Sequence, residues 1–211
     1  MGEQHRPGQA PTAASRSAAP DPVSGSTSEP ASDPASAAGD DPAGPRCSRN
    51  EWVVLGLLGE GSNHGFALAK ELSPGTDLGR ILTVRRSLVY RALDRLVSQG
   101  FAVPYQTEPG DAGPTRTIHR ISDAGAANLD RWLVEPVRHI RDVRVEFLLK
   151  LRLLERRGTS PETLVTAQRD ALTGTIAGLS DRLDDPEVDV VDRWRAQSAL
   201  AVSRFLDQLG S

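Results

Sequence analysis

A short stretch of the chain concentrates side chains that bind phosphate groups and base edges. Residues 85–95 read RRSLVYRALDR. They include one acid, Asp94, and four arginines: Arg85, Arg86, Arg91 and Arg95. A guanidinium group suits phosphate oxygens, and it can form two parallel hydrogen bonds with guanine in a major groove. Because the 211-residue chain has a formal net charge of -3, this local excess of positive charge needs a specific reason.

The arginines lie on a segment with helical periodicity. Residues 85–99 predict a helix, and Gly100 ends it at a position where helices favour glycine. At about 100° per residue, one arc of this helix is apolar: Leu88, Val89, Ala92, Leu93 and Leu96. The rest of the surface carries the candidate DNA contacts: Arg86, Ser87, Tyr90, Arg91 and Arg95. Arg85 falls on the apolar side, so we expect it to precede the regular helix or to extend out of it.

The elements around this helix predict how it is presented. A short helix over Phe66–Leu72, capped by Ser62 or Asn63, precedes it. The two helices make a helix-turn-helix, which presents the N-terminal residues of its second helix to a major groove. Two β-rich runs, Phe101–Thr107 and Arg116–Ile121, flank a loop rich in Gly and Pro and predict a hairpin. This hairpin is the wing of a predicted winged helix.

The wing has candidate contacts of its own. Thr115 and Arg116 lie where its second strand begins, and a basic group there reaches an adjacent minor groove or the DNA backbone. Ahead of the helix-turn-helix, residues 50–58 form an almost continuous apolar run, which fits either a buried helix or a strand.

The distribution of charge supports a local site. Residues 1–48 hold three of the 25 basic and six of the 28 acidic side chains, so the remaining residues carry 22 of each sign. A helix face with several arginines is common on protein surfaces. The ordered series of helix, helix, arginine-bearing helix and hairpin is what favours double-stranded DNA as the partner.

The first 48 residues are predicted to be disordered. They consist mainly of Ala, Pro, Ser and Gly, and such a segment buries too little apolar surface to offset its ordering entropy. No apolar stretch typical of a signal peptide follows the first residues, and no run of 18 apolar residues predicts a membrane span. The single cysteine, Cys47, excludes a disulfide framework and fits a reducing cytoplasm.

The last third of the chain is predicted to be helical. Ser122 or Asp123 caps a helix to about residue 134, and further helices cover about 137–157, 160–183 and 187–209. The final helix carries a narrow seam at steps of three and four residues: Val191, Trp194, Ser198, Ala201 and Phe205. This spacing fits a partner helix in a dimer, and it fits a core-facing stripe within one chain equally well.

Several motifs together resemble the PadR-family transcriptional regulators. They are the Gly-Leu-Leu of the first helix, the turn His64-Gly65-Phe66, a Tyr-x-Ala-Leu-x-x-Leu helix starting at Tyr90, and the helix start from Ser122 to Gly125. The resemblance covers about residues 50–134, and residues 141–154 are similar to the start of the family's C-terminal helices. The family often has Ser-Pro-Gly-Thr-Leu-Tyr where this chain has Arg85-Arg86-Ser87-Leu88-Val89-Tyr90, so the base contacts are expected to differ while the fold is retained.

The resemblance implies a homodimer held by C-terminal helices, which binds an inverted repeat and usually represses. It also implies a small-molecule effector. In the family, aromatic groups near the dimer interface can line the effector pocket, and Trp132 and Trp194 are the candidates for this role. The sequence favours a role as core or interface anchors for both tryptophans, because this is the more common role of such residues. A winged-helix module that binds proteins and has lost DNA binding is the alternative function.

Other site chemistries have little support in the sequence. Residues 59–65 resemble a Gly-rich dinucleotide loop, but His64 stands where the third Gly is needed and no alternation of strands and helices follows. The four histidines lack nearby Cys or His partners, so neither a metal site nor a cofactor is predicted. No catalytic set stands out, and we expect no enzymatic activity.

These observations predict a mostly α-helical protein. Residues 1–48 form the disordered tail, residues 49–134 a winged helix-turn-helix DNA-binding domain, and residues 135–211 a C-terminal α-helical dimerisation region.

Overall fold

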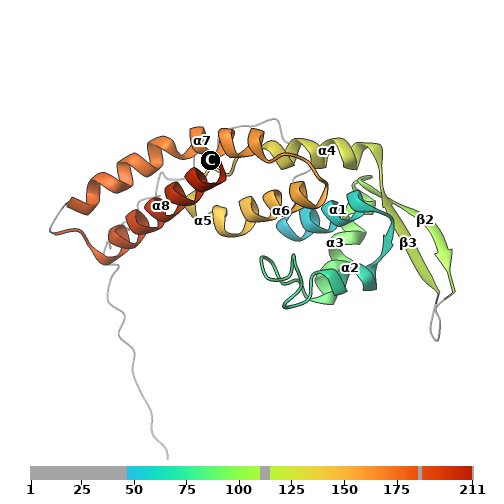
Figure 1. Cartoon of the computed structure of the whole chain (residues 1–211). Coiled ribbons are helices and arrows are strands. Elements are labelled where there is room, and N and C mark those ends of the chain that lie inside the picture. The colour runs from blue at the N-terminus through green and yellow to red at the C-terminus, as the bar shows by residue number, and fades with distance from the viewer. Residues whose placement is uncertain (1–46, 110–114, 185–186, 211) are drawn as a thin grey trace, which may run out of the picture. The chain divides into compact units, whose positions relative to one another are not determined.

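The computed structural model describes residues 47–109, 115–184 and 187–210. Most of these residues are helical, and the strands form one antiparallel sheet in the order β1-β3-β2 (Figure 1). This is the predicted fold class, a winged helix-turn-helix followed by C-terminal helices. The expected disorder of residues 1–46 lies outside the described residues.

The apolar run near residue 50 is a helix, α1 (Arg49–Glu60). Its start is fixed by a capping box: Ser48 Oγ accepts a hydrogen bond from the Glu51 backbone N–H, and the Glu51 carboxylate accepts one from the Ser48 N–H. Cys47 packs against the core. The folded part therefore includes Cys47 and Ser48, two residues that the sequence assigned to the tail.

The start of helix α2 (Gly65–Glu71) differs from the prediction. His64 is the cap, and its Nδ1 accepts a hydrogen bond from the Ala67 N–H at 3.2 Å. The prediction that Ser62 or Asn63 caps this helix is therefore wrong. Asn63 and His64 instead form the two-residue strand β1, in which Asn63 is opposite His119 and His64 is opposite Ile118.

A long ordered connection links α2 to α3. Leu78 and Val84 are buried in it, and the Val84 N–H donates to the Leu72 carbonyl at 3.1 Å. A Cβ atom on Gly79 would lie 1.8 Å from the Ser73 carbonyl oxygen, so this turn requires glycine. The connection keeps the two helices of the helix-turn-helix in contact although many residues separate them.

The arginine-bearing helix is α3 (Arg86–Ser98), and Arg85 is its N-cap residue, so it precedes the helix as predicted. Gly100 ends the helix with a positive φ of 76°. The apolar arc is narrower than expected because Leu88 is 36 % exposed. The buried residues are Val89, Ala92, Leu93 and Leu96.

The predicted hairpin is present as β2 (Ala102–Glu108) and β3 (Arg116–Ile121). The register pairs Ala102 with Ile121 and Glu108 with Arg116, with an irregularity between Pro104 and Gln106. Helix α4 (Asp123–Val134) follows, and Ser122 Oγ accepts a hydrogen bond from the Gly125 N–H at 3.0 Å. Ser122 is thus the cap, as predicted.

The C-terminal region is helical, with altered boundaries. Its elements are α5 (Ile140–Asp142), a π-helical turn (Val143–Phe147), α6 (Leu148–Arg156), α7 (Glu162–Ser180), a 3₁₀ turn (Asp181–Asp184) and α8 (Val190–Leu209). The helix expected over 137–157 therefore starts later and contains a π turn. Among the described residues, no helix combines the length and apolar character that crossing a membrane requires.

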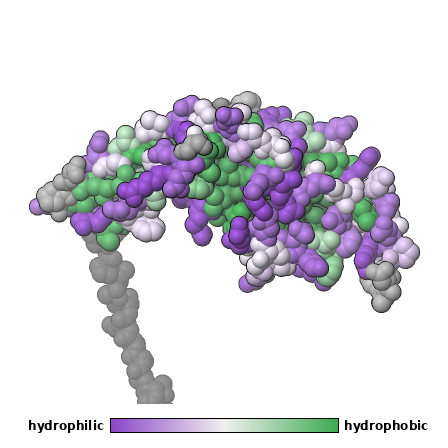
Figure 2. All heavy atoms as spheres, viewed as in Figure 1, coloured by the Kyte–Doolittle hydropathy of each residue, from purple (hydrophilic) through white to green (hydrophobic). Residues whose placement is uncertain are grey.

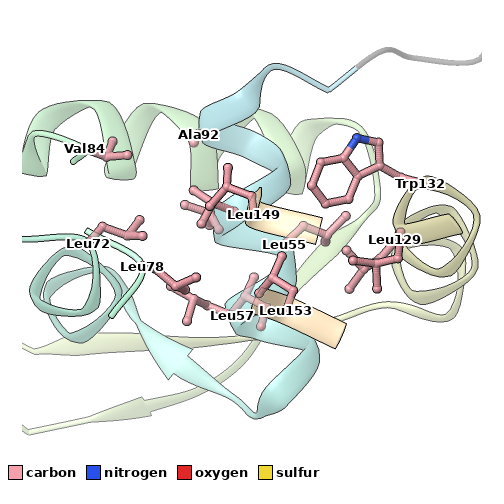
Figure 3. Close-up of a cluster of buried hydrophobic side chains, with 14 of the residues drawn as sticks. Leu55, Leu57, Leu72, Leu78, Val84, Ala92, Leu129, Trp132, Leu149 and Leu153 are labelled. Carbon is pink, nitrogen blue, oxygen red and sulfur yellow. The ribbon is translucent and has the colours of Figure 1, made fainter. Parts of the chain in front are cut away.

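The core joins the winged helix to the C-terminal helices. Leu149 and Leu153 of α6 lie beside Leu55 and Leu57 of α1, and Leu129 of α4 completes this group (Figure 3). At the point of closest approach, a Cβ on Gly56 would lie 2.6 Å from Leu153 Cδ1. The Leu153 side chain of α6 thus packs directly against the backbone of α1 at Gly56. The winged helix and the C-terminal helices share one hydrophobic core.

Candidate nucleic-acid interface

The N-terminal end of α3 presents exposed cations. Arg85, Arg86 and Arg91 are exposed, as are Ser87 and Tyr90 between them. Within the described part of the chain, none of the three arginines forms an ion pair. No side chain among the described residues caps the helix start, and its first turn has no acidic residue. A helix start with this composition is a suitable binding site for phosphate.

Arg95 differs from the other arginines of α3. Its Nε lies 3.1 Å from Glu51 Oε1, and the Glu51 side chain is only 5 % exposed. The same carboxylate closes the capping box of α1. Arg95 therefore has a structural role between α1 and α3, although its side chain is still 64 % exposed. Its predicted contact with DNA stays a prediction.

Two aromatic rings flank Arg86. The guanidinium carbon of Arg86 lies 5.0 Å from the Phe66 ring centroid and 5.6 Å from that of Tyr90. Phe66 is 52 % exposed and Tyr90 is 38 % exposed. Phe66 was not among the predicted site residues. The His-Gly-aromatic motif identified it as a residue of interest, but only the packing of α2 on α3 brings its ring to Arg86.

The wing supplies a second group of polar side chains. Thr115 is exposed and Arg116 is half-buried at the start of β3, opposite Glu108. The sequence did not predict a second stack of arginine on an aromatic ring, in which Arg120 lies 5.2 Å from the centroid of Tyr105. Tyr105 is 56 % exposed at the irregularity in β2. The wing therefore adds exposed polar and aromatic surface beyond the helix-turn-helix.

The two candidate effector tryptophans have different surroundings. Trp132 is 4 % exposed and stacks on Trp52, with ring centroids 4.7 Å apart. Its indole N–H donates to Glu146 at 3.2 Å, and Lys150 Nζ lies 4.8 Å from its ring centroid. Burial lowers the pKa of Lys150, and the nearby Glu146 carboxylate partly opposes that shift. Trp132 is thus held within the core.

Trp194 lies on the surface of α8, where it is 72 % exposed. Of the predicted seam, Val191 is 54 % exposed, Ala201 is also exposed, and Phe205 packs edge-to-face on Phe147. The buried face of α8 is a different one: Ala196, Ala199 and Leu206. Hydrophobic residues are visible on the surface around α8 (Figure 2). Much of the seam is therefore unburied in a single chain.

A small surface hollow of about 180 Å³ lies at the end of α1, and its lining includes Glu60, Glu71 and Arg156. Neither Trp132 nor Trp194 contributes to it. Within the described ranges, no three His, Cys, Asp or Glu side chains are grouped as a metal site requires.

The order of elements defines a class of protein. Helix α1, the pair α2–α3, the β2–β3 wing and α4 form a winged helix-turn-helix, and further helices follow it. The sequence profile of the transcriptional regulator PadR-like family matches residues 54–131. Residues 54–131, which include most of the winged helix-turn-helix, are therefore similar to the PadR-like family of transcriptional regulators. The general function that this match supports is DNA-binding transcriptional regulation.

Comparison with curated protein sequences gave no match. Among solved structures, Bacillus subtilis PadR in complex with operator DNA is 19 % identical, with a TM-score of 0.40 over 76 % of this chain and 97 % of that one. The smu.1604c protein of Streptococcus mutans UA159 is 16 % identical, with a TM-score of 0.37 over 77 % and 98 %. Bacillus subtilis PadR in complex with p-coumaric acid is 18 % identical, with a TM-score of 0.35 over 76 % and 93 %.

Proposed function

We propose that two copies of this chain bind an inverted-repeat operator and repress transcription, and that a small molecule releases the DNA. Each copy inserts the N-terminal end of α3 into a major groove. Arg85, Arg86, Ser87, Tyr90 and Arg91 contact bases and phosphates there, and Thr115 and Arg116 of the wing contact the neighbouring backbone or minor groove.

One observation carries the DNA-binding part of the proposal. Arg85, Arg86 and Arg91 are exposed and close together in sequence, and none has an ion-pair partner among the described residues. In contrast, Arg152, Arg156 and Arg157 of the C-terminal region are all paired with acids. Exposed arginines whose charge is not neutralised within the protein are suited to neutralise phosphates.

The dimer part of the proposal is supported by the exposed face of α8. Val191 and Trp194 are large apolar residues that α7 does not cover. An isolated winged helix contacts one half-site, whereas a dimer contacts two half-sites spaced by about one helical turn or a multiple of it. The test is Trp194→Asp compared with Arg193→Asp, an exposed neighbour off the seam. We expect only the first variant to be monomeric in light scattering and to lose affinity for a palindromic duplex.

The effector part of the proposal rests on Trp194. Its exposed indole offers a stacking surface for an aromatic molecule beside the proposed dimer interface. Trp132 is buried against Trp52, so its ring is not available to stack on such a molecule.

Binding selection from random duplexes, followed by affinity measurements over a range of salt concentrations, tests the whole proposal. We expect an enriched palindromic site and an affinity that falls steeply with salt, because arginines displace counterions from phosphates. If no sequence is enriched and duplex affinity is negligible at low salt, the protein is instead a winged-helix interaction module.

A further inference from the structure

We propose that Arg86 is the side chain with which this protein recognises guanine, and that Phe66 and Tyr90 hold it in the recognising orientation. The inference rests on the proposed function, because it requires α3 to enter a major groove. It goes further by assigning different roles to the three exposed arginines and by naming a positioning residue, Phe66, in another helix.

The geometry around Arg86 distinguishes it from its neighbours. Its guanidinium lies within 6 Å of two ring centroids, Phe66 from α2 and Tyr90 one turn further along α3. A stacked guanidinium uses its flat face, whereas its N–H donors point outward in the plane of the group. Those in-plane donors are the ones that pair with O6 and N7 of guanine. The aromatic contacts therefore leave the base-recognising edge available.

Stacking also restricts the side chain before DNA arrives. Arginine has many rotamers, and the entropy lost on ordering them weakens binding. Two rings that already confine Arg86 reduce that loss. Arg85 and Arg91 have no ring partner and no ion pair within the described residues, so they keep their rotamer freedom. We therefore assign Arg85 and Arg91 to phosphates, which accept many orientations, and Arg86 to a base.

The positions of both rings are fixed by the backbone of the helix-turn-helix. His64 caps α2 and lies roughly parallel to Phe66, with centroids 6.4 Å apart and an interplanar angle of 15°. Gly65 allows α2 to approach α3, because a Cβ there would lie 2.8 Å from Tyr90 Cε1. Phe66 is 52 % exposed, so part of its ring is accessible to the guanidinium of Arg86.

The test uses the full chain and its selected duplex, with each operator guanine replaced in turn by 7-deazaguanine. This analogue lacks the N7 acceptor and retains Watson–Crick pairing. For the wild type we expect roughly tenfold weaker binding at one guanine in each half-site, within the range of a bidentate base contact. In Arg86→Ala this sensitivity should disappear. In Arg91→Ala it should remain, while all duplexes bind more weakly by the same factor.

Variants of Phe66 test whether its ring positions Arg86. Phe66→Ala and Phe66→Leu should reduce the discrimination against 7-deazaguanine, and Phe66→Tyr should retain it. Melting temperatures should stay near that of the wild type, because half of the ring is exposed. Full discrimination in Phe66→Leu would show that bulk alone suffices and would overturn the positioning role.

The inference and the proposed function fail in different ways. If the wild type selects no duplex, the proposed function is wrong. If it selects a duplex whose 7-deazaguanine sensitivity is the same in Arg86→Ala, the protein binds DNA specifically but the assignment of Arg86 is wrong.

Discussion

The arginines at the start of α3 and those near the end of α6 are the same residue type in opposite states. Arg86 and Arg91 make no ion pair within the described chain, whereas Arg156 is bound by Glu60 and Asp77. Both groups lie on helices and both are accessible to some degree. The comparison shows that a count of arginines says little about DNA binding. An arginine is suited to neutralise phosphates where the protein has not already neutralised its charge.

The paired group, Arg152 and Arg156, joins three elements. Arg156 donates from Nε to Glu60 Oε1 at 2.8 Å and from Nη2 to Glu60 Oε2 at 2.6 Å, which ties α6 to the end of α1. Arg152 Nε lies 2.7 Å from Asp77, which ties α6 to the connection between α2 and α3. The hydrogen bonds from Arg156 to Glu60 are the main reason why the pKa of Arg156 is raised above its ordinary value. This group holds the winged helix against the C-terminal helices.

The largest expected effect is on DNA binding by the unpaired arginines of α3, Arg86 and Arg91. Arg86→Ala combined with Arg91→Ala should weaken binding to the selected duplex by about 2–5 kcal/mol, because one base contact and one phosphate contact are lost. Both side chains are exposed, so the melting temperature should change little. Fluorescence anisotropy and thermal unfolding measure the two quantities. Unchanged affinity would contradict the assignment of α3 as the recognition helix.

The opposite result is expected for the paired group. Arg156→Ala should lower the free energy of unfolding by about 1–2 kcal/mol, since Glu60 is left without its bidentate partner in a partly buried position. Affinity for DNA, measured per folded protein, should stay near the wild-type value. Chemical denaturation provides the first quantity. A variant that loses affinity but not stability would mean that Arg156 belongs to the DNA-binding surface.

The sequence alone could not separate these two groups of arginines. Helix α3 and its end at Gly100 were predicted well, because apolar periodicity and a C-terminal glycine are local signals. Ion pairs depend on partners far away in the chain: Glu51 for Arg95, and Glu60 for Arg156. Only the folded chain shows which arginines lack such a partner.

Other features were missed for related reasons. Strand β1 has two residues, which is too short to show any periodicity, so His64 was not recognised as the cap of α2. The apolar residues of the π turn Val143–Phe147 are equally compatible with an α-helix, so the sequence does not reveal the turn. The contact of Phe66 with Arg86 depends on how α2 packs on α3, and the local sequence does not predict that packing.

A smaller effect concerns the pH dependence of the paired group. The hydrogen bond from Arg152 is the main reason why the pKa of Asp77 is lowered from its ordinary value of 3.8. A carboxyl with a depressed folded pKa contributes stability that is complete above its unfolded pKa and is lost as the pH falls through the folded pKa. We therefore expect Asp77→Asn to reduce the melting temperature at pH 6 and to converge with the wild type in strong acid. A constant difference down to pH 2 would show that ionisation of Asp77 does not matter.

The smallest expected effect concerns residues 1–46, which carry three arginines and six acids and so add a net charge of -3. A negative charge of this size opposes the approach of DNA, and salt screens that opposition over about 10 Å at 0.1 M. Deleting residues 1–46 should tighten duplex binding by less than about threefold at low salt and leave it unchanged at physiological salt. The melting temperature should stay the same, because the segment has few side chains that build a core.

The deletion ends before Ser48, whose hydroxyl caps α1, and a second deletion of residues 1–48 serves as the matched comparison. That longer deletion should lower the melting temperature through loss of the cap, while the shorter one should not. Tighter binding that persists at high salt would mean that the segment acts by a route other than its charge.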